Sequence, residues 1–359
     1  MAALMAKERK QGRMHDSRTS RRYLLKTLAT AGGAVPAFDL WGQTASDAGG
    51  ANPRRIDVHH HYDLPGGRGP LGSWTPAKAI EEMDKHGIET SIISRTSGET
   101  EEGGEKGRAF ARKANEFAAK VVSDNRKRLG FFAIIPYSDT EGAMRELEYA
   151  YESLKADGVS LLSSISDKWP GDPAFDAVFE ELNRRKAILF LHPFTSKCCR
   201  NLIPGGEGSV ERDFDTTRAV TNLLYSGTLS RLPDIRYIIN HSGADVPVMA
   251  GRIKDRIPGF STFGGKQLSN HEGKTDKIPR GVFYELTKLY YECAHAAYPA
   301  AMAALTAFAP SSQYLFGTDW PAEPMESTLD ELPKAKLSPG VMQALNRGNA
   351  ERLFPRFKS

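Results

Sequence analysis

The sequence predicts an α/β protein of the (β/α)8 class, a TIM barrel, and three observations lead to that prediction. From residue 54 onward, eight short apolar runs alternate with eight amphipathic helical patterns, as expected when each parallel strand is followed by a helix. Several of these runs are β-branched or aromatic with little polar alternation, which is typical of strands buried on both faces. Residues 51–359 also suffice for one barrel, for which roughly 250 residues is usual.

The expected elements follow one another with no internal repeat and no second domain. The first helix starts with Thr75 as its cap and Pro76 in its first turn, a common helix start. An open doubly wound sheet is the alternative, but Gly66-Gly67 does not form a dinucleotide-binding fingerprint after a strand, and neither does Gly103-Gly104. The expected strands span residues 56–60, 90–94, 129–135, 158–162, 187–191, 236–240, 289–292 and 313–317. The expected helices span residues 75–85, 109–125, 140–155, 175–185, 216–232, 245–257, 300–308 and 338–348.

Charge, cysteine content and hydropathy exclude several classes of protein. The net charge is +4, but residues 1–48 hold eight Lys and Arg and four acidic residues, so residues 49–359 hold 40 of each sign. A nucleic-acid-binding domain normally carries a basic excess, so no nucleic-acid partner is expected. Cys198, Cys199 and Cys293 lack metal-finger spacing and are interpreted as ordinary thiols. No apolar run reaches the ~18 residues of a membrane span, so none is expected in the mature chain.

The first 50 residues have the pattern of an export signal. The segment SRRYLLK at residues 20–26 precedes a mildly apolar stretch over residues 27–37, and small residues continue to residue 50. A basic region, an apolar region and a small-residue tail make a secretory signal, and paired arginines are typical of the twin-arginine type. We therefore expect residues 1–50 to be a twin-arginine export signal and flexible linker, and residues 51–359 to be the barrel domain. The protein would be periplasmic, with the twin-arginine export machinery as a partner.

Polar residues suited to metal binding stand at the carboxyl ends of four expected strands. The first strand leads into His59 and His61, the fifth into His192, the sixth into His241 and the eighth into Asp319. Barrel enzymes carry out their chemistry at this face. Residues two apart in a strand point to the same side, so His59 and His61 are expected to point together.

Three imidazoles and one carboxylate suit Zn²⁺, with Mn²⁺ or Co²⁺ as alternatives. Such an ion lowers the pKa of bound water from ~15.7 to about 7. Asp319 would bind the ion and accept a proton from the attacking water, and His241 would be a nearby acid or base. The arrangement predicts a hydrolase that acts on a small organic substrate through metal-activated water. His60 points away from this group and is interpreted as a packing residue.

The sequence resembles the amidohydrolase superfamily, and within it the amidohydrolase-related branch that contains aminocarboxymuconate semialdehyde decarboxylase and related decarboxylases. The resemblance runs from Arg55 to about Phe357, which is nearly the whole body of the chain. The segments that carry it are IDVHHH, WTPAKAIEEMDKHGIETSIIS, ADGVSLL, GDPAFDAVFEELNRR, LFLHP, NHSGADVPVMAGRI, YYECA, LFGTDWP and RGNAERLF.

The resemblance implies the same four metal ligands and His241 as the catalytic histidine. It also implies that Arg252 grips a substrate carboxylate across the interface of a homodimer, because an arginine at that place in the decarboxylase comes from the neighbouring subunit. A surface ion pair is the alternative interpretation of Arg252. Arg68 and Arg95 are further candidates for a carboxylate clamp, and Trp320, next to Asp319, is assigned to the substrate-binding residues.

The same residues serve more than one chemistry, so the spacing of the ligands does not select among them. Hydrolysis of a small, carboxylated or aromatic-derived substrate is the main prediction. Non-oxidative decarboxylation of an aromatic or muconate-type acid is the alternative, and a carboxylate clamp at Arg252 would favour it. Hydration is a third chemistry of this branch. An exported metal-binding or ligand-binding protein without activity is the remaining alternative, and His241, a proton-transfer group, argues against it.

Overall fold

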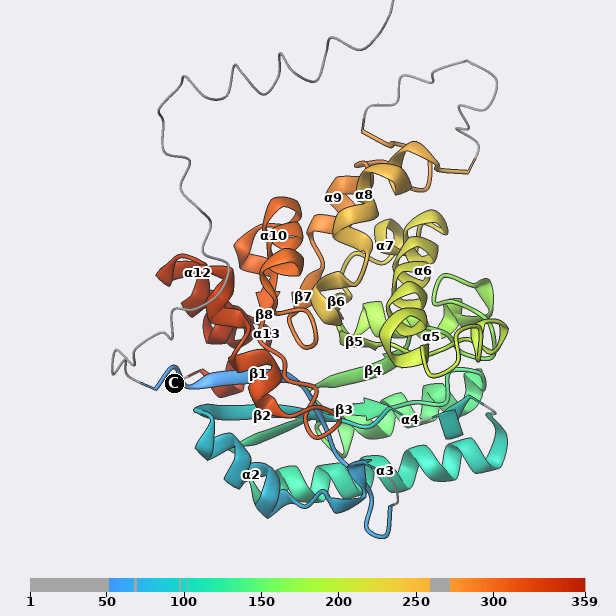
Figure 1. The fold of residues 1–359 in the computed structure, drawn as a ribbon. Helices are drawn as coiled ribbons and strands as arrows, with labels where there is room; N and C mark the ends of the chain where they lie inside the picture. Colours follow the sequence, from blue (N-terminus) through green and yellow to red (C-terminus); the bar gives the residue numbers. More distant parts are fainter. Residues whose placement is uncertain (1–51, 68–69, 97, 102, 259–271, 359) are drawn as a thin grey trace, which may run out of the picture. The chain divides into compact units, whose positions relative to one another are not determined.

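The structure is a computed structural model that describes residues 52–67, 70–96, 98–101, 103–258 and 272–358. Its centre is one sheet of eight parallel strands in the order of the chain, as the sequence predicts (Figure 1). Each strand overlaps the range expected for it. The strands are β1 Arg55–His61, β2 Ile88–Ser94, β3 Leu129–Ile134, β4 Gly158–Leu162, β5 Ile188–His192, β6 Arg236–Ile239, β7 Tyr290–Glu292 and β8 Tyr314–Leu315.

The segment after β8 closes the barrel against β1. The backbone N–H of Val58 donates to the carbonyl of Phe316 at 3.0 Å, and the N–H of Asp319 donates to the carbonyl of His59 at 2.7 Å. Isolated parallel bridges join Asp57 to Phe316 and His60 to Trp320. Closure therefore brings the residues that follow β8 beside the histidines of β1.

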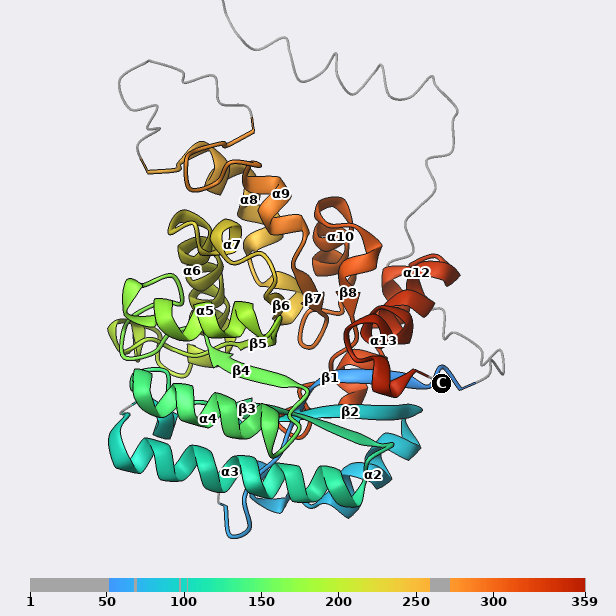
Figure 2. The same cartoon turned by 180° about the vertical axis from the view of Figure 1, so that it is seen from behind.

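Helices pack around the outside of the sheet (Figures 1 and 2). Thr75 caps the first of them, accepting a bond from the backbone N–H of Lys78 at 3.2 Å, and Pro76 stands in its first turn, as predicted. The helix expected over residues 216–232 differs most from the prediction. It begins at Arg212, directly after a π-helical turn, and is interrupted at Gly227, where φ is +83°. The helices are α2 Pro76–Lys85, α3 Gly104–Asp124, α4 Thr140–Glu152, α5 Asp176–Arg184, α6 Arg212–Tyr225, α7 Thr228–Arg231, α8 Val246–Asp255, α9 Val282–Thr287, α10 Pro299–Phe308, α11 Met325–Leu329, α12 Pro339–Gln343 and α13 Asn349–Leu353.

Side chains from the strands fill the barrel interior, so the barrel is a packed core and not a channel. Val58, Phe132 and Phe190 are fully buried in this interior cluster, and Phe354 from the end of the chain packs with them. A larger cluster fills the layer between the sheet and the helices. Chemistry is thereby confined to the open end of the barrel, where the strands reach their carboxyl ends.

An irregularity in β1 decides which side chains reach that end. Val58 belongs to the interior cluster, so strict alternation would turn His59 and His61 away from the barrel. The register of β1 against β2 shifts between Asp57 and His60. His59 accordingly packs edge-on against Phe190 of the interior, with ring centroids 4.9 Å apart. Such shifts often re-aim side chains beside active sites.

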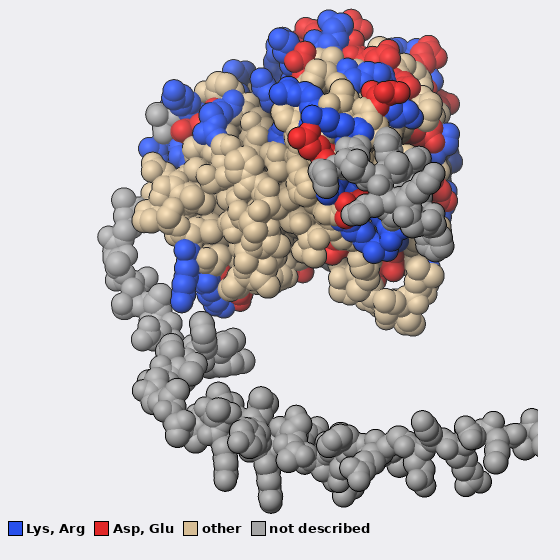
Figure 3. Space-filling view, turned by 90° about the horizontal axis from the view of Figure 1, so that it is seen from above, with Lys and Arg blue, Asp and Glu red and all other residues tan. Residues whose placement is uncertain are grey.

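The surface of the described barrel carries charges of both signs. On the face seen in Figure 3, Lys and Arg lie interspersed with Asp and Glu, beside a broad area without charged side chains. Within the described ranges, no helix combines the length and the hydropathy that a membrane crossing requires. The predicted export signal and the candidate clamp Arg68 lie outside the described residues.

Candidate active site

The four residues assigned to a metal from the sequence converge at the carboxyl ends of β1, β5 and β8. Nε2 of His61 lies 3.2 Å from Nε2 of His59 and 3.1 Å from Nε2 of His192. Oδ1 of Asp319 lies 2.7 Å from Nε2 of His61 and 3.2 Å from Nε2 of His59. The four side chains are buried, and their donor atoms all lie within 4.8 Å of one another.

This packing fits a divalent cation better than it fits a set of hydrogen bonds. Atoms that bind one ion at about 2.0–2.2 Å lie roughly 3–3.5 Å from one another, which is close to the separations observed. Nε2 of His61 faces three polar atoms, although an imidazole nitrogen carries at most one proton. Oδ1 of Asp319 is buried, and its contacts with the two imidazoles do not have the geometry of hydrogen bonds. The donor set is therefore that of a site for one ion held by three imidazoles and one carboxylate.

Residues behind the cluster hold two of its rings in place. Nδ1 of His59 lies 2.9 Å from Oε1 of Glu292, the fully buried last residue of β7. Nδ1 of His61 lies 3.3 Å from the carbonyl of Ser94, the last residue of β2. A partner on the outer nitrogen fixes the tautomer of a metal-binding histidine and orients its ring. Both contacts turn Nε2 toward the cluster.

The electrostatics of the cluster favour the metal-binding forms of His192 and Asp319, whereas they favour a proton on His59. Burial, with the neighbouring His61 and His59, places the pKa of His192 well below its usual value. Burial would raise the pKa of Asp319, but His59 and His61 hold it well below the usual range. Burial would lower the pKa of His59, but Asp319 and Glu292 outweigh it and raise the pKa to about 10. Two carboxylates therefore favour positive charge at this point, and a bound cation would replace the proton on His59.

His241 lies beside the cluster and has one free nitrogen. Its Nδ1 lies 2.7 Å from Oδ1 of Asp213, and its backbone N–H donates to Oε1 of Glu292 at 2.9 Å. Its Nε2 is buried without a hydrogen-bond partner, and its ring stacks on that of His59 with centroids 5.7 Å apart. A carboxylate on Nδ1 leaves Nε2 as the atom that can give or take a proton. This geometry suits an acid or base.

Asp213 and Asp57 contribute to the site although the sequence did not reveal them. Asp213 lies in the first turn of α6, upstream of the start expected for that helix. Asp57 accepts from the backbone N–H of Thr318 at 3.1 Å and from its hydroxyl at 2.6 Å, so it anchors the turn that carries Asp319. The acidic residues before residue 216 were a helix-start signal that could have located Asp213.

A further histidine, His295, contacts the other oxygen of the same carboxylate. Its Nε2 lies 2.7 Å from Oδ2 of Asp319, and its ring centroid is 4.8 Å from that of His241. It stands in the turn after β7, and about a third of its side chain is exposed. It was not among the predicted site residues, although it follows β7 by three residues, much as His241 follows β6 by two.

His60 and Trp320 lie outside the metal cluster. Their rings pack together with centroids 4.9 Å apart, and both residues are buried. For His60 this placement agrees with its interpretation as a packing residue. Trp320 belongs to the large core cluster, so its assignment to the substrate stays a prediction.

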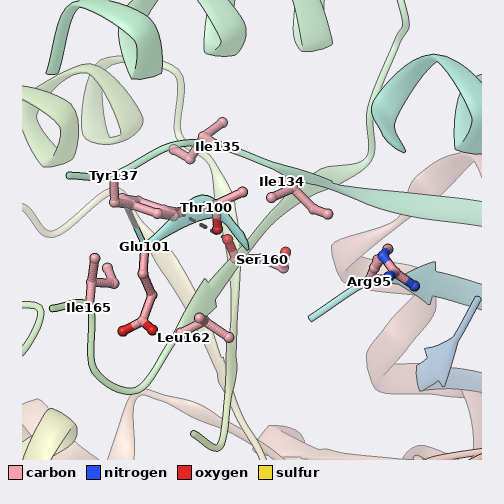
Figure 4. Close-up of a pocket in the computed structure, with 9 residues that line it drawn as sticks. All are labelled: Arg95, Thr100, Glu101, Ile134, Ile135, Tyr137, Ser160, Leu162 and Ile165. Carbon is pink, nitrogen blue, oxygen red and sulfur yellow. Dashed lines mark hydrogen bonds between the residues drawn. The ribbon is translucent and has the colours of Figure 1, made fainter. Parts of the chain in front are cut away.

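Arg95 lies just after β2, beside a small cavity at the ends of β3 and β4 (Figure 4). Its guanidinium pairs with the buried carboxylate of Asp63 and lies over the ring of Phe110 at 5.5 Å. The cavity, of about 10 Å³, has room for roughly one water molecule. The charge of Arg95 is thus already compensated within the chain.

Arg252 lies on α8 and is exposed. It lines a groove of about 540 Å³ between α6 and α8, together with Arg218, Tyr225 and Arg256. The residues that line this groove include no member of the metal cluster. Within one chain, the structure therefore does not bring Arg252 to the site.

Comparisons with known proteins relate this fold and site to one family. The family model described as amidohydrolase matches residues 56–356. The decarboxylase yanB of Aspergillus niger is 30% identical over 340 residues, which cover 85% of this chain and 88% of that protein. The 6-methylsalicylic acid decarboxylase of Penicillium expansum is 29% identical, covering 85% of this chain and 97% of that protein.

A solved structure gives the same result for the fold. The dihydroxybenzoic acid decarboxylase of Polaromonas sp. JS666, solved with bound manganese and the inhibitor 2-nitroresorcinol, aligns with a TM-score of 0.69 at 21% identity. The alignment covers 85% of this chain and 98% of that one.

The main prediction of hydrolysis is wrong, and the relatives support its alternative, decarboxylation. The error has a physical cause, since hydrolysis and decarboxylation use the same ligands at the same spacing. With the family model matching nearly all of the barrel, the chain is an enzyme of the amidohydrolase family, in the branch of aminocarboxymuconate semialdehyde decarboxylase and related decarboxylases.

Proposed function

We propose that this enzyme is a metal-dependent carboxy-lyase that removes CO2 from a small aromatic acid without an oxidant. The observation that carries the proposal is the unpartnered, buried Nε2 of His241 beside a cluster of three imidazoles and one carboxylate. The similarity to aromatic-acid decarboxylases over 85% of the chain supports the same reaction.

Decarboxylation needs a proton donor where the carboxylate leaves. The bond between the ring carbon and the carboxylate breaks, its electron pair stays on the ring carbon, and that carbon takes a proton. Nε2 of His241 is placed to give this proton, because Nδ1 is held by Asp213. The exposed side of Asp213, at 38% side-chain exposure, gives the pair access to solvent for reprotonation.

The cluster would hold one divalent ion through His59, His61, His192 and Asp319. The ion would supply positive charge for the acidic oxygens of the substrate and for the charge that develops as CO2 leaves. Three imidazoles and a carboxylate suit Zn²⁺, whereas the Polaromonas enzyme holds manganese. We propose Zn²⁺ and expect a chelated protein to regain activity best with that ion. Better recovery with Mn²⁺ would assign manganese instead.

The reaction is tested by incubating metal-loaded protein with hydroxylated and methylated benzoic acids and with muconate-type acids. Mass spectrometry should find a product lighter by one CO2, and an Asp319→Ala variant should form none. A product heavier by one water, or no product from any acid while one ion stays bound, would contradict the proposal.

We further propose a homodimer in which Arg252 of one subunit binds the substrate carboxylate in the other. Its exposure on α8, away from the cluster of its own chain, supports this role. Arg252→Ala should raise KM about 10–100-fold with a smaller change in kcat, as expected for the loss of a charge-assisted hydrogen bond. Arg256→Ala, in the same groove, is the control. A monomeric protein in sedimentation, or an unchanged KM, would count against the shared site.

Finally, we propose export to the periplasm by the twin-arginine route, on the strength of Arg21 and Arg22. Changing both residues to lysine should leave the protein in the cytoplasmic fraction of a bacterial host. Unchanged fractionation would overturn this proposal.

A further inference from the structure

The two oxygens of Asp319 have separate surroundings. Oδ1 faces Nε2 of His61 at 2.7 Å and Nε2 of His59 at 3.2 Å. Oδ2 lies 2.7 Å from Nε2 of His295. A carboxylate with both oxygens free can bind an ion through one oxygen or through both. The contact with His295 occupies one lone pair of Oδ2 and so disfavours binding through both oxygens.

We propose that His295 is a positioning residue that holds Oδ2 of Asp319 and so leaves Oδ1 as the single oxygen that this carboxylate offers to the ion. The inference rests on the metal site of the proposed function. In this role His295 orients the metal ligand Asp319 and does not itself bind the ion.

The backbone around His295 favours a dedicated role. Its φ is +55°, in the left-handed region that residues with a Cβ rarely adopt. Asp319 itself has a φ of +62°, and its N–H is tied to the carbonyl of His59 at 2.7 Å. Two disfavoured conformations thus meet at one short contact between side chains. Conformations of this kind persist where the surrounding structure holds them, and they concentrate at functional sites.

Two of the three ligand rings show the same design, whereas Nδ1 of His192 is buried without a hydrogen-bond partner. The outer nitrogen of His59 is held by Glu292 and that of His61 by Ser94. His295 completes this pattern for the carboxylate. An Asp319 limited to one oxygen leaves more of the ion's surface to the carboxylate and ring oxygens of an aromatic acid. His295 would thereby set how the substrate can bind as well as how tightly the ion is held.

The test compares metal affinity among variants, using competition with a chromogenic chelator for Zn²⁺ and for Mn²⁺. His295→Leu should weaken the affinity about 10–100-fold, the range found when partners of metal ligands are removed. His295→Gln should stay within a few-fold of the unchanged protein, because its amide nitrogen can take the place of Nε2. His295→Asn has a shorter side chain and should resemble the leucine variant. KM should also rise for the acid that the mass-spectrometric test finds to be decarboxylated. The variant that loses most metal affinity should show the largest rise in KM.

His86 supplies a matched control. It also makes a hydrogen bond and a carboxylate contact, to the carbonyl of Glu82 at 2.9 Å and to Glu326 at 3.0 Å. It precedes β2, at the opposite end of the barrel from the cluster. His86→Leu should leave metal affinity unchanged. If His295→Leu fails to fold by circular dichroism, the comparison of the glutamine and asparagine variants decides instead.

The outcomes separate this inference from the proposed function. An unchanged protein that binds no ion would overturn both. A protein that binds one ion with equal affinity in all His295 variants would overturn the role of His295 and leave the proposed function standing. Two ions per chain would also overturn it, because His295 could then be a ligand with His241 and Asp319, whose donor atoms lie within 4.8 Å of one another.

Discussion

Replacing Asp319 with alanine is expected to remove both metal binding and turnover. The substitution deletes the only carboxylate in the four-residue cluster, whose Oδ1 lies 2.7 Å from His61. It also leaves His61 without its carboxylate neighbour, whereas His59 keeps Glu292 at 2.9 Å. We expect metal affinity to fall by more than 100-fold, beyond the 10–100-fold typical of lost outer partners. With the ion lost, the rate should fall by roughly 10⁴-fold. Elemental analysis of the purified protein and product formation measure the two effects.

Asp234→Ala is the control for this substitution. Asp234 is exposed and precedes β6, at the end of the barrel away from the cluster. It should keep both the ion and the activity. An Asp319→Ala protein that still binds one ion per chain with its original affinity would show that the carboxylate is not a ligand.

Replacing His241 with asparagine is expected to separate chemistry from metal binding. His241 is not one of the four residues whose donor atoms form the main cluster, so the ion should stay bound. The asparagine side chain has no counterpart of Nε2 and does not titrate. The loss of a positioned acid or base typically costs 10²–10⁴-fold in rate. We expect kcat to fall by about that factor while metal content stays at one ion per chain.

Asp213→Asn tests the same assignment from the other side of the ring. It keeps the shape of the partner at 2.7 Å from Nδ1 but removes the charge that fixes the tautomer. A smaller loss of kcat than in His241→Asn is expected, with unchanged metal affinity. If His241→Asn retained full turnover, another group would be the proton donor, and His241 would have no catalytic role.

Much of the candidate site could be read from the sequence because it follows the strand ends. His192 is the last residue of β5, and His241 comes two residues after β6. In a parallel barrel all such positions meet at one face. Hydrophobic runs locate the strands, so they also locate residues at their ends. The resemblance to the amidohydrolase superfamily implied the same roles for these residues and added the candidate clamp Arg252.

Asp213, Glu292 and His295 were harder to find because their contacts depend on the tertiary structure. Glu292 ends β7 but reads as one acidic residue among many until its oxygens are seen beside His59 and His241. Asp213 lies 28 residues before His241, and nothing in either local pattern relates the two. The type of reaction also could not be predicted from the spacing of the ligands, since the same metal cluster serves hydrolysis and decarboxylation.

The sequence by itself determined the eight strands, their parallel order and the four side chains that meet in the candidate metal cluster. The periodicity of hydrophobic residues and the position of a residue at a strand end are both local properties of the sequence. They can therefore be read before the tertiary structure is known. Only the tertiary structure decided which side of β1 faces the mouth, because the register shift between Asp57 and His60 overrides strict alternation. It likewise decided that Glu292 of β7 stands behind His59 of β1, because the closed barrel brings these two strands together.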